Sequence, residues 1–119
     1  MDLSGPQSRL LLQLMSASSA RGKVIANNIA NQNTPGYRRQ ELLFEDLLRK
    51  EMSGVAPDLA SIEPKLVTDT HSTSRADGNN VQMELEMSTL KENQILYNLY
   101  ASMLTGRSRM MQSAIYGDR

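Results

Sequence analysis

The stretch MELEMSTLKENQILYNLYASMLTGRSRMMQSAI, residues 83–115, decides the fold of this chain. Apolar and small residues recur in it at alternating spacings of four and three, the periodicity of one face of a long α-helix. Glu84 and Glu86 lie near its start and Arg107 and Arg109 near its end, in the order that a helix dipole favours. The main row consists of Met83, Met87, Leu90, Gln94, Tyr97, Ala101, Leu104, Ser108, Met111 and Ile115.

This predicted helix is too long to be covered by its own chain. A helix of about 35 residues spans about 50 Å, more than a small globular domain. A second apolar row lies outside the main one, and it consists of Leu96, Leu99, Met103 and Met110. One antiparallel partner helix cannot bury both rows, so we expect a subunit that its neighbours complete. The expected packing positions are Met87, Leu90, Tyr97, Leu104, Met111 and Ile115.

A second helix is predicted near the N-terminus. Pro6 suits a first helical turn, and Thr34-Pro35 ends the pattern because proline disfavours the helical conformation of the residue before it. Within the row, Ser18 and Gly22 are small enough to let another helix approach closely. Pro35-Gly36 fits the centre of a type II turn, with a positive φ at Gly36. The row consists of Leu11, Met15, Ser18, Gly22, Ile25 and Ile29.

The middle of the chain is predicted to be weakly structured. A short helix is expected over 44–52, whereas residues 53–79 are rich in Ser, Thr, Asp and Gly and offer little to bury. Asp77-Gly78 has turn chemistry, and Asn79 or Asn80 is expected to cap the C-terminal helix. The predicted fold class is all-α: N- and C-terminal helices form an antiparallel coiled-coil hairpin with a flexible or weakly structured middle segment. The segments are 1–36, 37–79 and 80–119.

Composition excludes several functions. Thirteen basic residues balance thirteen acidic ones, which argues against nucleic acid and anionic membranes as partners. The absence of cysteine excludes disulfides and thiolate metal sites. His71, the one histidine, lies in the polar middle, and no nucleophile has a base placed to activate it. We therefore expect no enzyme activity, metal, cofactor or small-molecule substrate. Arg38-Arg39 either binds an acidic neighbour or is merely solvated, and the sequence leaves both open.

Residues 26–37, ANNIANQNTPGY, resemble the signature of the flagellar axial proteins, the rod, hook and hook-associated subunits. The pattern from Asp77 to Val81, with Glu86-Met87, Glu92-Asn93 and residues 114–117, is similar to proximal rod proteins of the FlgB family in particular. The motif residues are Asn27, Asn28, Ile29, Asn31, Asn33, Pro35, Gly36 and Tyr37. Their asparagines either satisfy the helix end within one chain or reach an adjacent subunit; both interpretations stay open.

The resemblance implies a structural subunit of the flagellar basal-body rod, assembling helically to transmit torque and to line the export channel. It implies a place in the periplasmic rod, reached through the flagellar type III export apparatus without a cleaved signal peptide. The implied partners are copies of itself, other rod proteins, and the adapter that joins the rod to the export gate and membrane ring.

The resemblance also assigns export-gate recognition to Phe44 and Leu48, which match the family's Phe-x-x-x-apolar pattern. The plain alternative is the apolar face of a short helix. The alternative function is a cytoplasmic helical adaptor or chaperone for secretion partners, which the cellular location would distinguish from a rod subunit.

Overall fold

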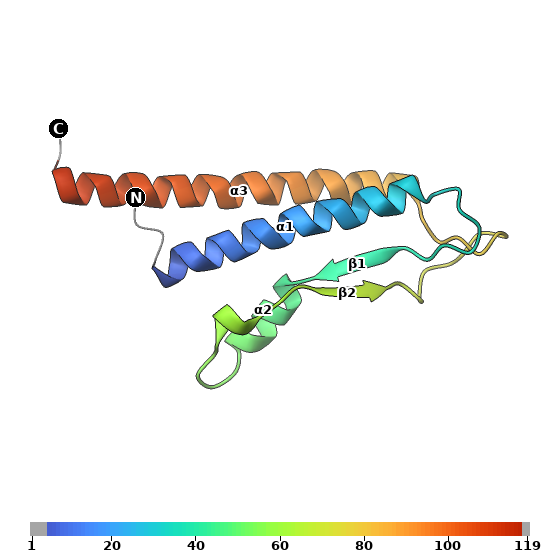
Figure 1. Ribbon diagram of the computed structural model, residues 1–119, viewed down its shortest axis with the longest axis horizontal. Coiled ribbons are helices and arrows are strands. Elements are labelled where there is room, and N and C mark those ends of the chain that lie inside the picture. Colours follow the sequence, from blue (N-terminus) through green and yellow to red (C-terminus); the bar gives the residue numbers. More distant parts are fainter. Residues whose placement is uncertain (1–4, 118–119) are drawn as a thin grey trace.

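Two long helices, α1 (Pro6–Ala30) and α3 (Met83–Tyr116), lie side by side along the molecule (Figure 1). The structure, a computed structural model, describes residues 5–117. Ser8 contacts Arg107 at one end of α1 and Asn28 contacts Glu86 at the other, so the helices run antiparallel. The radius of gyration is 18.2 Å, against about 14 Å for a compact chain of this length. Residues 1–4 and 118–119 of the two predicted end segments lie outside the described residues.

The approach of α3 to α1 confirms the role predicted for the two small residues of α1. Ser18 is completely buried, and a Cβ added at Gly22 would lie 3.6 Å from the side-chain amide nitrogen of Asn93. An alanine at position 22 would only touch Asn93, but a bulky side chain at either position would push the helices apart. Within the described residues, no helix is both long and apolar enough to cross a membrane.

The face that α3 turns toward α1 differs from the predicted coiled-coil row. Its two fully buried residues are Glu86 and Asn93, both polar, whereas Met87 of the predicted row is exposed. The interface is therefore rotated from the apolar row toward a polar one. Apolar periodicity missed this because it counts every polar residue as facing solvent.

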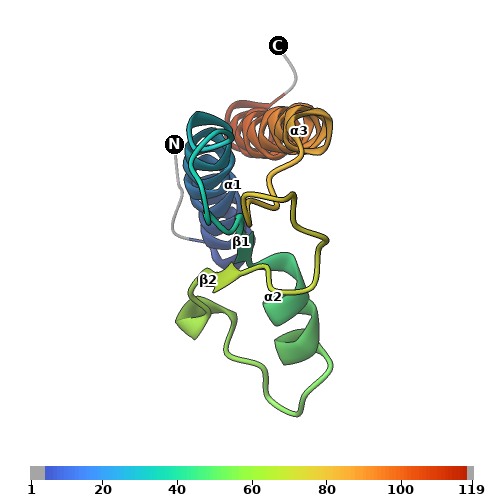
Figure 2. The same cartoon turned by 90° about the vertical axis from the view of Figure 1, so that its right-hand side faces the viewer.

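The chain is mostly helical, as predicted, but it is not all-α, because its middle forms a two-stranded sheet. Strand β1 (Gln40–Leu43) pairs antiparallel with β2 (Lys65–Thr68), in a register that sets Gln40 opposite Thr68 and Leu43 opposite Lys65. Helix α2 (Glu45–Met52) and a 3-10 turn, η1 (Leu59–Ser61), lie between the strands. Figure 2 shows the strands and α2 beneath α1, with α3 beside it. The short helix expected over 44–52 is confirmed as α2, whereas the pairing of β1 with β2 is not predicted by the sequence.

A small apolar cluster attaches this middle segment to α1. Phe44, which precedes α2, is almost fully buried against Ala17 of α1 and Leu48 of α2. The partly buried side chains around them are Leu10, Leu14, Leu59 and Ile62. Burying a phenylalanine side chain contributes roughly 1.5–3 kcal/mol, which explains why a mainly polar segment still folds here.

Candidate functional site

The two sequence motifs that carry the family resemblance meet at one end of the molecule. The amide of Gly36 donates a hydrogen bond of 2.8 Å to the carbonyl of Asp77. Gly36 and Gly78 both have positive φ, 73° and 85°, and a Cβ added at Gly78 would lie 3.4 Å from the Cα of Gly36. The backbone amide of Tyr37 closes the turn by donating a hydrogen bond of 3.2 Å to the carbonyl of Thr34. The predicted turn, including its positive φ at Gly36, is confirmed.

Asn79 caps the end of α1 rather than the start of α3. Its side-chain amide donates to three carbonyls in the turn after α1, those of Asn31 (2.9 Å), Gln32 (3.2 Å) and Thr34 (2.9 Å). These carbonyls lack helical partners because α1 ends at Ala30. The N-cap of α3 is Gln82, which makes no side-chain capping bond. The predicted capping role of Asn79 or Asn80 is therefore wrong.

Asn28 joins α1 to the start of β1. Its side-chain oxygen accepts hydrogen bonds of 2.9 Å from the Gln40 amide and the Tyr37 hydroxyl, and its nitrogen donates to the Gln40 carbonyl at 2.8 Å. This pairing imitates a neighbouring strand, and it leaves Asn28 with no exposed surface. A residue without both a donor and an acceptor could not replace it.

The other motif residues divide between internal contacts and the surface. Asn27 donates to the Tyr37 hydroxyl at 3.1 Å, and Asn31 donates to the Asn27 carbonyl at 2.8 Å. Ile29 is half-buried, whereas Asn33 and Pro35 are exposed. The structure thus places Asn27, Asn28 and Asn31 in contacts within one chain.

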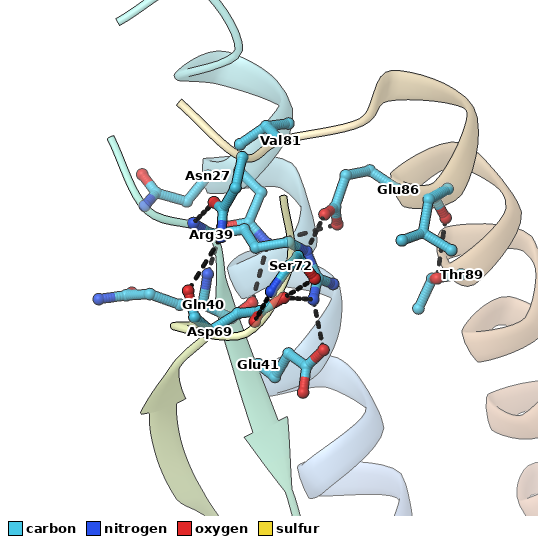
Figure 3. A network of polar contacts seen from close by, with 12 residues as sticks. Asn27, Arg39, Gln40, Glu41, Asp69, Ser72, Val81, Glu86 and Thr89 are labelled. Atoms are coloured by element: carbon cyan, nitrogen blue, oxygen red, sulfur yellow. Dashed lines mark hydrogen bonds and ion pairs between the residues drawn. The ribbon is translucent and has the colours of Figure 1, made fainter. Parts of the chain in front are cut away.

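Arg39 is buried among three carboxylates of its own chain (Figure 3). Its guanidinium pairs with Glu86 of α3 at 2.6 Å, with Asp69 after β2 at 3.1 Å, and with Glu41 of β1. Arg38 is exposed. The Arg38-Arg39 pair therefore splits: Arg39 has acidic partners inside the molecule, and Arg38 lies at the surface.

The polar contacts determine the charge states of Arg39 and Asp69. Burial alone would lower the pKa of Arg39, but its hydrogen bonds to Glu86, Glu41 and Asp69 outweigh burial and hold that pKa above its ordinary value. The hydroxyl and amide of Ser72 donate to the Asp69 carboxylate, and they hold the pKa of Asp69 well below its usual range. Both groups therefore stay ionised near neutral pH.

Asn80 completes the arrangement, which we call the polar junction: Asn28, Arg39, Asp69, Asn79, Asn80 and Glu86. The side-chain oxygen of Asn80 accepts from the Arg39 amide at 2.6 Å, and its nitrogen donates to the Asp69 carbonyl at 2.9 Å. The junction thus connects both long helices to both strands. Its chemistry is that of a structural joint, since each of these side chains contacts another part of the chain.

The predicted packing and export positions lie away from the junction. Leu90, Leu104 and Met111 are half-buried, whereas Met87, Tyr97 and Ile115 are exposed. Phe44 and Leu48 are buried together in the apolar cluster. The structure therefore brings the two export positions together, whereas only three of the six packing positions are even partly buried.

The structure also bears on candidate metal chemistry. In residues 5–117, no group of three or more His, Cys, Asp or Glu side chains is arranged to hold a metal ion. His71 lies exposed in the turn after β2, where its amide donates to Asp69 at 2.9 Å.

Sequence reasoning missed Arg39, Asp69 and Glu86 as a unit. Their positions are far apart in the chain, and no local spacing links them. One signal was available: Glu86, Asn93, Tyr100 and Arg107 recur every seven residues within the predicted helix. Such a repeat places the four side chains along one side of the helix, but it does not by itself separate a buried polar face from a solvated one.

Comparisons with known proteins agree on one family. The family described as flagella basal body rod protein matches residues 15–38. The FlgB rod protein of Borrelia hermsii is 32% identical, over 71% of this chain and 76% of the relative. Those of Bacillus subtilis and Escherichia coli are 28% and 27% identical, over 88% and 90% of this chain and 89% and 91% of the relatives. The chain belongs to the FlgB family of flagellar basal-body rod proteins, and it is a structural subunit of that rod.

Proposed function

We propose that this subunit occupies the proximal rod and assembles helically through the outer side of α3, with the end segments 1–36 and 80–119 as its packing units. The carrying observation is an exposed apolar row that we call the outer stripe: Ile95, Leu99, Met103 and Met110, which are 67%, 51%, 52% and 74% exposed. Leu96, which the sequence suggested for this row, is half-buried instead.

The outer stripe has the character of an interface. Its members follow one another at spacings of four, four and seven, so they share one side of the helix. Residues 93–106 contain no Asp, Glu, Lys or Arg. A contiguous apolar surface without charged residues is typical of the centre of a protein–protein contact. The occupants we propose are copies of this chain and related rod proteins, in a tube that transmits torque and surrounds the export channel.

The remaining partners follow from the family. We propose the adapter between rod, export gate and membrane ring, and the type III export apparatus, which delivers the chain to the periplasmic rod without a cleaved signal peptide. Because Phe44 and Leu48 are buried after folding, the export apparatus would contact them only while the chain is unfolded. The names of the relatives favour a rod subunit over a cytoplasmic adaptor or chaperone.

Charge placed on the outer stripe tests this proposal. Leu99→Asp and Met103→Asp are expected to leave the circular dichroism of the isolated chain unchanged, because both side chains are half exposed. In cells that lack the natural chain, both variants should fail to appear in detergent-washed basal bodies and should abolish swimming. Thr105→Asp, at an exposed position on another side of α3, is the matched control. Normal incorporation of Leu99→Asp and Met103→Asp would refute the proposed interface.

A further inference from the structure

The inner face of α3 carries a regular row of polar side chains, which we call the polar ladder: Glu86, Asn93, Tyr100 and Arg107. Successive members are seven residues apart, so they lie along one side of the helix. Glu86 has no exposed surface and Asn93 is 7% exposed, while Tyr100 and Arg107 are half-buried. A surface row would be solvated, so burial of this row calls for a different explanation.

Each member of the polar ladder has its own partner. Asn93 donates to the Ser18 carbonyl at 2.8 Å and accepts from Arg21 at 3.4 Å. Arg107 donates to the Ser8 hydroxyl at 3.1 Å, at the start of α1. Figure 3 shows Glu86 of α3 beside Arg39. The contacts are therefore distributed along the whole length of α1.

The third member, Tyr100, is half-buried, and burial together with the nearby Glu45 carboxylate raises the pKa of its phenol. Glu45 itself pairs with Arg21 of α1. The direct hydrogen bonds of the ladder to α1 therefore come from Asn93, from Arg107 and, through Asn28, from Glu86.

The four members cannot replace one another. They are a carboxylate, an amide, a phenol and a guanidinium, so moving α3 by one heptad changes the chemistry at every position. If Glu86 moved to the place of Asn93, its carboxylate would face the Ser18 carbonyl, an acceptor against an acceptor; it would meet Arg21 there, but Arg39 would lose Glu86. In the opposite direction, Asn93 would replace Glu86 beside Arg39 and remove the buried ion pair. Neither one-heptad shift therefore keeps the contacts of the native register.

α3 also offers a competing surface. The outer stripe is apolar and exposed, so apolar burial alone would not exclude packing of α1 on the stripe. Buried polar groups that form hydrogen bonds in one arrangement and lose them in the others favour the first arrangement.

We propose that the polar ladder selects α1 of the same chain for the inner face of α3, in a single register, and so reserves the outer stripe for other subunits. Of these two statements, only the one that the outer stripe is reserved for other subunits rests on the proposed function. The ladder residues are thus specificity determinants that sort the intramolecular contact from the intermolecular one.

Spin-label distances in the isolated full chain test this assignment. The chain has no cysteine, so Lys23→Cys on α1 and Ser102→Cys on α3, both at exposed positions, provide two unique labels. With the ladder intact we expect one narrow distance. With Asn93→Leu and Arg107→Leu added, we expect helix content to persist and a second distance to appear, displaced by about 10 Å for a heptad slip.

Two further variants sharpen the result. Asn98→Leu with Thr105→Leu also replaces two polar residues seven apart by leucine, but at exposed positions, and should keep the single distance. Asn93→Arg with Arg107→Asn keeps the composition but exchanges two members of the ladder, and should lose the single distance.

Retention of one native distance without the ladder would overturn the proposal. So would loss of helix in Asn93→Leu/Arg107→Leu, or several distances in the intact chain. None of these outcomes depends on whether the chain enters a rod.

Discussion

Gly36 and Gly78 lie in contact across the polar junction, each with a positive φ, so that the turn after α1 and the turn before α3 fit against each other. The positive φ at both positions is what favours glycine; a Cβ at Gly78 would lie 3.4 Å from the Gly36 Cα, whereas one at Gly36 would meet nothing within 4 Å.

Gly78→Ala should destabilise the chain. A left-handed backbone conformation costs an L-residue about 1–2 kcal/mol, and the added methyl group would press on Gly36. Urea denaturation followed by circular dichroism would measure the change. Gly106→Ala is the control, because nothing lies within 4 Å of its added Cβ and its helical backbone favours alanine by about 0.5–1 kcal/mol. Equal effects of the two substitutions would contradict the assigned strain.

Arg39→Met should lower the free energy of unfolding by about 3–5 kcal/mol, because it leaves buried carboxylates without a cation. That is a large part of the roughly 5–15 kcal/mol available to most domains. Chemical denaturation would measure the loss. Arg38→Met, at the exposed neighbouring position, should change stability by less than about 0.5 kcal/mol. A tolerated Arg39→Met would show that the junction does not hold the fold together.

Acid should loosen the polar junction through Asp69. The pKa of Asp69 is lower in the folded chain than its unfolded value of about 3.9, so its stabilising contribution is complete above that value. The contribution is lost progressively as the pH falls through the folded pKa. Asp69→Asn should flatten the acid limb of a stability-against-pH curve. Ser72→Ala should flatten it partly, since Ser72 Oγ is one of the donors that lower this pKa.

Phe44→Ala needs a control variant that separates stability from export, because Phe44 is both an apolar-cluster residue and a proposed export contact. The substitution should cost about 3–5 kcal/mol by opening a cavity. Leu14→Ala also opens a cavity in this cluster and should cost about 2–5 kcal/mol of stability, but it leaves Phe44 and Leu48 unchanged. Secretion assays should show export blocked by Phe44→Ala and retained by Leu14→Ala. Equal export of both variants would remove Phe44 from the proposed recognition.

Local chemistry made parts of the fold predictable. Pro6 and Thr34-Pro35 bracket α1, Gly36 marks the turn, and the small Ser18 and Gly22 mark where α3 approaches. Each of these signals acts through neighbours in the sequence or through side-chain size. The sequence alone could therefore identify both long helices and one point of their contact.

Long-range polar pairing made the rest unpredictable. The sheet and the polar junction depend on Arg39 meeting Asp69 and Glu86, and neither spacing nor hydropathy encodes that meeting. The inner face of α3 was misassigned for a related reason, because Glu86 and Asn93 satisfy their polar groups inside the molecule. Asn79 could be recognised as a cap, but not as the cap of a different helix.

The apolar cluster packs on the first half of α1, through Leu10, Leu14 and Ala17, whereas the polar junction holds its last turn. Hydrophobic burial weakens on cooling, whereas ion pairs and carboxylate hydrogen bonds respond to protons. Cooling should thus loosen the packing of the first half of α1 before its last turn, and acidification should do the reverse. Residue-resolved amide exchange could follow the two responses separately along one helix.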